Sequence, residues 1–357
     1  MVSLKDTGAR AQLTMQRRRF LLVSAFSLLS LGCHALTKGA AAADRQKVIK
    51  RVAFGSCARQ DRPQPIWDVI AAARPDLFLF IGDNVYGDTE DMSVLAKKYR
   101  ELAAKPEFGR FRARVPILAT WDDHDFGVND GGVEYPKKEE SKRAMLDFFG
   151  EPPESERWRR PGVYTAYCLG PAGKRVQLIL LDLRWFRTAL VHDPANGGYL
   201  ANEDSRATML GCQQWAWLEQ ELRKPAELRI IASSTQFSSP DHRFEKWANF
   251  PREKERMLRL LDRLNIRNAL IISGDMHYGE LSSEQTPAGF TLYDLTSSGL
   301  NQHEPGAHLP NRNRIAIYDQ SANFGFVEID WDSSPVAVSL QVRDVHGRAV
   351  IRRDVSY

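Results

Sequence analysis

The chain has 357 residues, of which 43% are hydrophobic and 26% charged. This length and composition exclude a small disulfide-held fold and an intrinsically disordered chain, and they allow either two domains or one large α/β domain. Residues 1–43 hold six basic residues and one acidic residue, which leaves 43 basic and 44 acidic residues in the rest of the chain. A net charge of −1 there gives no indication of a nucleic-acid-binding patch.

The first 43 residues have the three-part layout of an export signal. Arginines at positions 17 to 19 precede an apolar run that begins at Phe20, and a stretch of small residues ends at Ala43. The apolar segment, about 17 residues if extended to Leu36, is short for a hydrocarbon core of ~30 Å. We therefore predict a cleaved signal rather than a retained membrane anchor, and a periplasmic or secreted mature chain of residues 44–357.

The segment from Gln16 to Leu22 resembles the twin-arginine signal, and this resemblance implies that the twin-arginine export machinery is a partner. Leu31-Gly32-Cys33 is similar to a lipoprotein cleavage site, which leaves lipid attachment at Cys33 as an alternative. Cleavage after Ala43 would leave three cysteines, so at least one sulfur is unpaired or otherwise engaged.

The mature chain alternates apolar runs with amphipathic segments. Strands are predicted at residues 51–57, 76–83, 115–122, 176–183, 228–234 and 268–275. Helices are predicted at residues 64–73, 92–104, 137–150, 213–222 and 252–264. This alternation predicts an α/β sandwich whose central strands are largely parallel.

The C-terminal part of the chain changes character. Strands are predicted at residues 290–296, 324–331, 337–343 and 349–355, and with no linker before them we interpret them as further strands of the same sandwich. Residues 184–210 and 299–323 show no clear periodicity and are predicted to be long loops. Such loops in a compact fold are usually lids, binding loops or disordered segments.

Polar side chains able to bind metal follow the predicted strands. The groups are Gly55-Ser56-Cys57, Gly82-Asp83-Asn84-Val85-Tyr86, Trp121-Asp122-Asp123-His124-Asp125, Gln236 and Gly274-Asp275-Met276-His277. In open α/β sheets ligands bind beyond the carboxyl ends of the strands, so we expect these groups to converge. Their convergence implies a metal, because unpaired buried charge is costly.

The order Gly-Asp-x-x-Tyr, Asp-Asp-His-Asp and Gly-Asp-x-His resembles the calcineurin-like metallophosphoesterases, and more closely the PhoD-like alkaline phosphatases. The resemblance extends over most of the mature chain. It implies a four-layer α/β/β/α sandwich over residues 44–357, in which a metal-activated hydroxide hydrolyses phosphate diesters, monoesters or both.

The resemblance also implies roles for individual residues. One metal site would collect Cys57, Asp83, Tyr86 and His277, a mixture of donors that suits Fe(III). The other would share Asp83 and add the oxygen donors Asp123, Asp275 and Gln236, which suit Ca²⁺. A Mn²⁺ or Zn²⁺ pair is the alternative.

Three further assignments concern catalysis and substrate binding. By its place in the third motif, His124 would be the acid that protonates the leaving group. Arg184 and Arg187 follow a strand end and are predicted to bind the substrate phosphate, while His303 and His308 are candidate substrate contacts. The alternative to an enzyme is a non-catalytic, metal-stabilised binding protein on the same fold.

Overall fold

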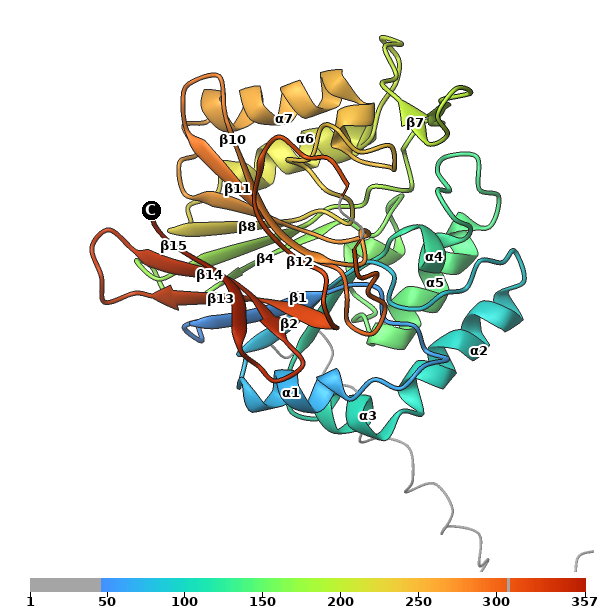
Figure 1. Ribbon diagram of the computed structural model, residues 1–357, viewed down its shortest axis with the longest axis horizontal. Helices are drawn as coiled ribbons and strands as arrows, with labels where there is room; N and C mark the ends of the chain where they lie inside the picture. Colours follow the sequence, from blue (N-terminus) through green and yellow to red (C-terminus); the bar gives the residue numbers. More distant parts are fainter. Residues whose placement is uncertain (1–45, 307–308) are drawn as a thin grey trace, which may run out of the picture. The chain divides into compact units, whose positions relative to one another are not determined.

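Two β-sheets packed face to face form the centre of the protein (Figure 1). The computed structural model describes residues 46–306 and 309–357. The predicted export signal, Cys33 and His308 lie outside these ranges. Within them, no helix combines the length and hydrophobicity needed to cross a bilayer.

The first sheet has six strands in the order β15-β14-β13-β1-β2-β3. They are β1 (Arg51–Gly55), β2 (Leu77–Ile81), β3 (Ile117–Thr120), β13 (Asn323–Asp330), β14 (Ala337–Asp344) and β15 (Ala349–Ser356). Strands β1, β2 and β3 are parallel, and β13, β14 and β15 extend the sheet beyond β1 as an antiparallel meander.

The second sheet has seven strands in the order β12-β10-β11-β9-β8-β5-β4. They are β4 (Thr165–Leu169), β5 (Val176–Leu180), β8 (Leu228–Ala232), β9 (Ala269–Ser273), β10 (Gly279–Gln285), β11 (Thr291–Ser297) and β12 (Arg314–Tyr318). The four central strands β11, β9, β8 and β5 are parallel to one another, and the outer strands are antiparallel to their neighbours.

Helices cover the outer face of each sheet. The first sheet is covered by α1 (Ile66–Ala72), α2 (Met92–Ala103), α3 (Pro106–Arg112) and α5 (Lys138–Phe149), and the second by α6 (Gly211–Leu222) and α7 (Pro251–Arg263). In Figure 1, α6 and α7 lie on one side of the two sheets and α1, α2 and α3 on the other. The predicted four-layer α/β/β/α sandwich is therefore confirmed.

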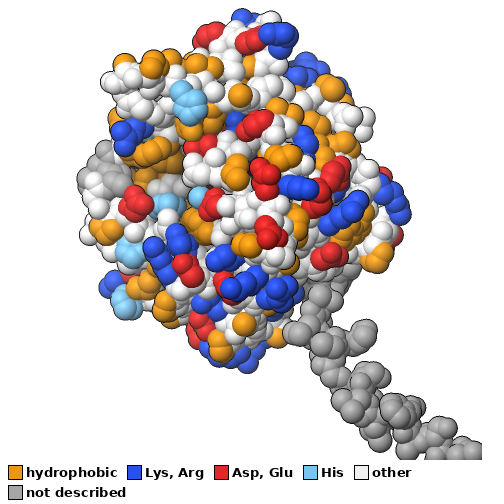
Figure 2. Space-filling view, turned by 90° about the vertical axis from the view of Figure 1, so that its right-hand side faces the viewer, with side chains coloured by type: hydrophobic (Ala, Val, Ile, Leu, Met, Phe, Trp, Pro, Cys, Tyr) orange, Lys and Arg blue, Asp and Glu red, His pale blue; other side chains and the backbone are white. Residues whose placement is uncertain are grey.

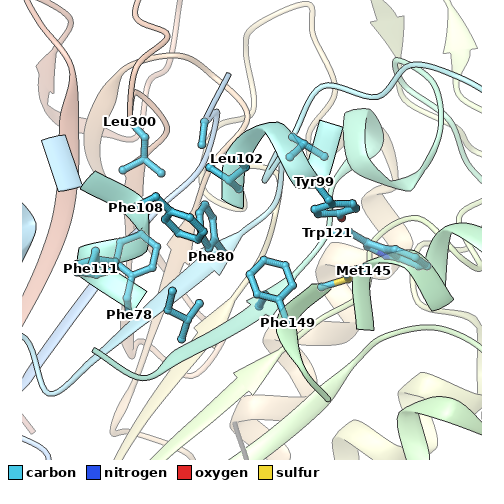
Figure 3. Packing of buried hydrophobic residues seen from close by; sticks show 14 of the residues in the cluster. Phe78, Phe80, Tyr99, Leu102, Phe108, Phe111, Trp121, Met145, Phe149 and Leu300 are labelled. Atoms are coloured by element: carbon cyan, nitrogen blue, oxygen red, sulfur yellow. The ribbon is translucent and has the colours of Figure 1, made fainter. Parts of the chain in front are cut away.

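Alternation along the strands decides which layer each side chain joins. On β2, Phe78 and Phe80 point to the helical layer, where both rings lie against Trp67 of α1 at centroid distances of 5.3 and 5.4 Å. Figure 3 shows these two phenylalanines among aromatic side chains of the covering helices. Leu77 and Leu79 point the other way, into the core between the sheets. Both faces of the strand are buried, as expected for a parallel sheet covered on both sides.

The six predicted central strands and the five predicted helices are all present, with ends shifted by a few residues. The C-terminal strands do join the sandwich, β11 in the second sheet and β13 to β15 in the first. Sequence reasoning missed β4, β10, β12, α3, the short helix α4 (Asp123–Phe126) and the two short strands β6 (Val191–His192) and β7 (Tyr199–Leu200). Strand β12 lies in the segment 299–323, which we predicted as a loop. Strand β10 is rich in polar residues, because buried Glu280 and Ser282 belong to a hydrogen-bonded cluster rather than to the hydrophobic core.

Candidate metal centre

The carboxyl ends of β1, β2, β3 and β9 meet at one edge of the sandwich and bring the predicted metal ligands together. Three overlapping groups have potential ligand atoms within 4.8 Å of one another. They are Cys57 with Asp83 and His277, Asp83 with Asp123 and His124, and Asp122 with Asp123 and Asp275. Asp83 and Asp123 each belong to two of these groups, and Asp83 is the residue predicted to be shared by two metal ions.

Unusual backbone conformations mark the same residues. Cys57, Asp83, Asp275 and His277 have φ angles of 60°, 47°, 73° and 59°. For residues other than glycine this left-handed conformation costs about 1 kcal/mol or more each, and it concentrates at functional sites. The neighbouring Gly82 is required by close approach, because a Cβ there would lie 2.5 Å from Cβ of Asp122.

The first ligand group combines sulfur, oxygen and nitrogen donors. Oδ2 of Asp83 lies 3.4 Å from Sγ of Cys57 and accepts a hydrogen bond of 3.2 Å from the Tyr86 hydroxyl. That hydroxyl also lies 3.3 Å from Nε2 of His277. Burial raises the pKa of the Cys57 thiol and of the Tyr86 phenol, and in both cases the carboxylate of Asp83 adds to the effect.

The second ligand group consists of carboxylates. Burial raises the pKa of Asp122 to about 7 despite the nearby guanidinium of Arg184. Burial also acts to raise the pKa of Asp123, but Arg184 and His124 outweigh it and lower that pKa to about 2. The pKa of Asp275 is raised by burial and by the charges of Asp122 and Asp123. Without a bound cation, ionising all of these carboxylates would cost a large amount of free energy.

The donor set fits metal ions. Oδ1 of Asp83 and Oδ2 of Asp122 are buried, and no N–H or alcohol group in the described part of the chain donates a hydrogen bond to them. Buried carboxylate oxygens are normally paired, so these two atoms are suited to a cation. Thiolate, phenolate and imidazole suit a transition metal, whereas the carboxylates suit a harder cation.

His124 lies at the exposed side of this centre, with 18% of its side chain accessible. Its Nδ1 atom is 2.7 Å from Oδ1 of Asp88, and its ring packs on that of Tyr86 with centroids 4.3 Å apart. Burial acts to lower the pKa of His124, but the carboxylates of Asp83 and Asp88 outweigh it and raise the pKa to about 11. Figure 2 shows that histidine side chains reach this side of the molecule among interspersed acidic and basic ones.

Arg184 and Arg187 are both buried, and their predicted contact with the substrate phosphate stays a prediction. The Arg184 guanidinium is fully buried and pairs with Asp122, with Glu245 at 2.6 Å, and with Asp123 at 3.9 Å. Arg187 is 1% exposed, and its Nε lies 3.0 Å from Glu245. Both guanidinium groups are thus engaged by protein carboxylates behind the ligand groups. The contacts of Arg184 are those of a residue that holds Asp122 and Asp123 in place.

Gln236 is buried in a polar cluster on the second sheet. Its amide donates to Glu280 at 3.2 Å and to Thr296 at 2.9 Å, and its carbonyl oxygen lies 3.5 Å from the hydroxyl of Tyr278. These contacts occupy both ends of the amide, and its role as a metal ligand stays a prediction.

The profile of the PhoD-like phosphatase family matches residues 52–340. The chain belongs to this family. Alkaline phosphatase D from Bacillus subtilis (strain 168) is 24% identical to this PhoD-like chain over 311 residues, which cover 69% of the chain and 51% of the relative. The chain therefore spans about half the length of that curated relative.

Solved structures share the fold of this PhoD-like chain. A structure of PhoD has a TM-score of 0.64 at 17% identity, covering 88% of this chain and 73% of that one. GAP50, the anchor in the inner membrane complex of Plasmodium, has a TM-score of 0.57 at 13% identity, covering 87% and 89%. The family resemblance inferred from the motifs is confirmed, and the individual ligand roles stay predictions.

The PhoD-like site includes residues to which sequence reasoning gave no role. Gln302 and Glu304 come from the segment predicted as a loop, and they contact His277 at 3.1 and 3.2 Å. No periodicity or motif marks them. Asp88 lies five positions after Asp83 and contacts His124 directly.

Proposed function

We propose that this PhoD-like phosphatase hydrolyses phosphate diesters, monoesters or both at the centre formed by the three ligand groups. The observation that carries the proposal is the convergence of buried metal-ligating side chains with an accessible histidine at one edge of the sandwich. The family match supports the reaction class.

Cys57, Tyr86 and His277 would hold one metal ion together with Asp83, and Asp123 and Asp275 would hold a second with the same aspartate. Metal ions in such a centre lower the pKa of water and neutralise charge on phosphate oxygens. We propose Fe(III) for the mixed-donor group and Ca²⁺ for the carboxylate group, with a Mn²⁺ or Zn²⁺ pair as the alternative.

The protein's own contribution to proton transfer rests on His124. Asp88 holds Nδ1 at 2.7 Å and so fixes the ring with Nε2 as the free nitrogen. In the metal-free protein, the carboxylates of Asp83 and Asp88 raise the pKa of His124 to about 11 and so favour the protonated imidazole. His124 is therefore suited to donate a proton to the departing alkoxide, while Asp88 orients it.

The decisive test compares two leaving groups. General acid catalysis contributes ~10²–10⁴-fold, and it matters most when the leaving alkoxide is a strong base. His124→Asn should lose activity near the upper end of that range on alkyl phosphate esters and near or below the lower end on p-nitrophenyl esters, with unchanged metal content. His346→Asn, in the turn between β14 and β15, is the matched control. Equal losses on both substrates would assign His124 to positioning or charge stabilisation instead.

Metal identity has a direct spectroscopic test. If Cys57 and Tyr86 bind Fe(III) as anions, charge transfer from these ligands should colour the purified protein. Ca²⁺ bound through flexible oxygen ligands should be labile, so EGTA should abolish activity and added Ca²⁺ should restore it while iron stays bound. A colourless, active protein that contains only zinc would refute the assignment.

One observation favours a non-catalytic alternative. A fold neighbour with a TM-score of 0.57 is described as an anchor, so this sandwich also occurs in a protein described by a structural role. Assay of the metal-loaded protein on bis-p-nitrophenyl phosphate separates the two functions. Metal binding without turnover of this or any monoester substrate would support the alternative.

Export through the twin-arginine route is a separate proposal, which rests on Arg17 and Arg18 ahead of the apolar segment. That route carries folded proteins, which suits a centre loaded with metal before export. Replacing both arginines by lysine should trap the precursor inside the cell. Normal export of this variant would overturn the proposal.

A further inference from the structure

We propose that Tyr199 is a positioning residue for Asp123 and acts through Asp130. The inference rests on the proposed function, in which Asp123 is a metal ligand. Tyr199 lies in residues 184–210, where β6 (Val191–His192) and β7 (Tyr199–Leu200) pair to form a short hairpin.

Asp130 is the direct link to the ligand group. Its backbone N–H donates a hydrogen bond of 2.7 Å to Oδ2 of Asp123. Its φ angle is 56°, a conformation that residues other than glycine seldom adopt without support. Its carbonyl oxygen accepts a hydrogen bond from the side chain of Arg187. The direction of the N–H therefore depends on how firmly Asp130 is held in this conformation.

Tyr199 holds the Asp130 side chain. The Tyr199 hydroxyl donates to Oδ2 of Asp130, which also accepts a bond of 2.7 Å from the amide of Asn129. Tyr199 lies opposite His192 in the hairpin, and their rings pack with centroids 5.0 Å apart. A phenol bonded to a carboxylate is a charge-assisted contact, which is stronger than a hydrogen bond between neutral groups.

The hairpin itself is anchored through its backbone. The Tyr199 N–H donates to the carbonyl oxygen of Arg243 at 2.7 Å, and the amide of Asn249 donates to the carbonyl oxygens of Tyr199 and Leu200 at 3.2 Å each. Gly198 has a φ angle of 81°, and a Cβ there would lie 2.2 Å from the Arg243 oxygen. The phenol of Tyr199 is therefore held in place independently of Asp130.

The two oxygens of Asp123 are thus oriented from opposite directions. Oδ1 accepts from the backbone N–H of His124 at 3.0 Å, and Oδ2 accepts from Asp130. Residues that orient a metal ligand typically change metal affinity by ~10–100-fold when removed. Tyr199 is one hydrogen bond further from Asp123 than Asp130 is, so removing its hydroxyl should lower the metal affinity by a smaller factor.

The test measures Ca²⁺ affinity by calorimetry on the full chain after chelator treatment. Tyr199→Phe removes only the hydroxyl and should weaken Ca²⁺ binding roughly 3- to 10-fold, less than the loss of a direct partner of a ligand. Asp130→Ala should weaken it at least as much. The double variant should match Asp130→Ala, because the phenol acts only through that carboxylate. Thr286→Val is the matched control, since its hydroxyl donates to Asp262 at 2.7 Å beyond the far end of β10.

The outcomes separate this inference from the proposed function. If Tyr199→Phe lowers only the thermal midpoint and leaves Ca²⁺ affinity unchanged, Tyr199 is merely structural and the inference fails. Additive losses in the double variant would also overturn it. Asp123→Asn tests the ligand itself. Unchanged Ca²⁺ affinity in that variant would refute the proposed metal site, whereas lost affinity there with an unaffected Tyr199→Phe would refute only the positioning role.

Discussion

The mixed-donor group and the carboxylate group are linked by the close approach of Asp83 to Asp123, but they differ in the charge that surrounds them. In the mixed-donor group, burial raises the pKa of Cys57 and Tyr86 and lowers that of His277, so all three side chains are neutral at pH 7 without metal. In the carboxylate group, the buried cation of Arg184 keeps Asp123 ionised, with a pKa of about 2. The protein supplies a compensating charge to one group and leaves the other to be compensated by its metal.

This difference predicts how each group takes up a metal. Ligands must be deprotonated to bind, so metal entering the mixed-donor group releases protons from Cys57 and Tyr86, and its affinity rises with pH. In the carboxylate group, Asp123 has no proton to release near neutral pH, whereas Asp275, whose pKa is raised by burial, would release one. The two groups therefore differ in which donor atoms would lose protons on metal binding, even though they lie within one cluster.

The largest effect on metal content and activity is expected from replacing Asp83, the residue proposed to serve both metal ions. Asp83→Asn deletes a carboxylate that lies within 4.8 Å of ligand atoms from both groups. We expect loss of both metals and a fall in phosphoesterase activity of more than ~10²-fold, beyond the usual effect of removing a supporting partner. Metal analysis and a kinetic assay check this. Retention of one metal at full occupancy would show that Asp83 does not bridge.

Removing the compensating cation should destabilise the fold itself. Arg184→Met leaves the buried carboxylate of Asp122 without its arginine and Glu245 with Arg187 alone, and breaking such a buried ion pair costs about 3–5 kcal/mol. Urea unfolding of the metal-free protein measures the loss. Arg175→Met, which breaks a half-exposed pair with Glu227, should have a much smaller effect. Similar losses in both variants would mean that Arg184 compensates no buried charge.

The metal-free protein should lose stability as pH rises. Burial raises the pKa of Asp122 to about 7 and of Asp125 to about 8, well above the ordinary value of 3.8. A carboxyl group with a raised pKa in the folded state contributes fully below pH ~4, and that contribution is lost as pH rises through the folded value. The thermal midpoint after chelator treatment should therefore fall as pH rises from about 4 to about 8. Bound metal should reduce this fall, and an equal fall with metal present would contradict the interpretation.

The smallest expected effect concerns Gln236. Its amide contacts Glu280 and Thr296 and contributes to the polar cluster of the second sheet. Gln236→Leu should cost about 1–3 kcal/mol, because a buried carboxylate loses a donor, and should change Ca²⁺ affinity less than about threefold. A tenfold or larger loss of Ca²⁺ affinity would instead make Gln236 the oxygen ligand that the sequence predicts.

The sandwich and the convergence of its ligands could be predicted because both follow from local patterns. Apolar runs such as residues 76–83 identify strands buried on both faces, and parallel strands necessarily end at one edge. Polar residues directly after those runs, such as Asp83 and Asp275, therefore lie close together at that edge of the sandwich.

The charge network behind the ligands could not be predicted, because it depends on contacts between distant segments. An arginine after a strand end can face solvent or the interior, and nothing near Arg184 in the sequence shows that it pairs with Asp122 and Glu245. Polar strand β10 was missed for a related reason. The partners that make burial of Glu280 tolerable, such as Arg314, belong to other strands.

The pairing of β1 with β13 has a consequence for how the protein is made. Strand β1 lies between β2 and β13, and Arg51 is paired with Glu328 near the other end of the chain. During synthesis, one edge of β1 therefore stays unpaired until almost the whole sequence has emerged. Contacts between residues so far apart slow folding, and open strand edges are sites of aggregation. We expect newly made chains to depend on chaperones until β13 closes the first sheet.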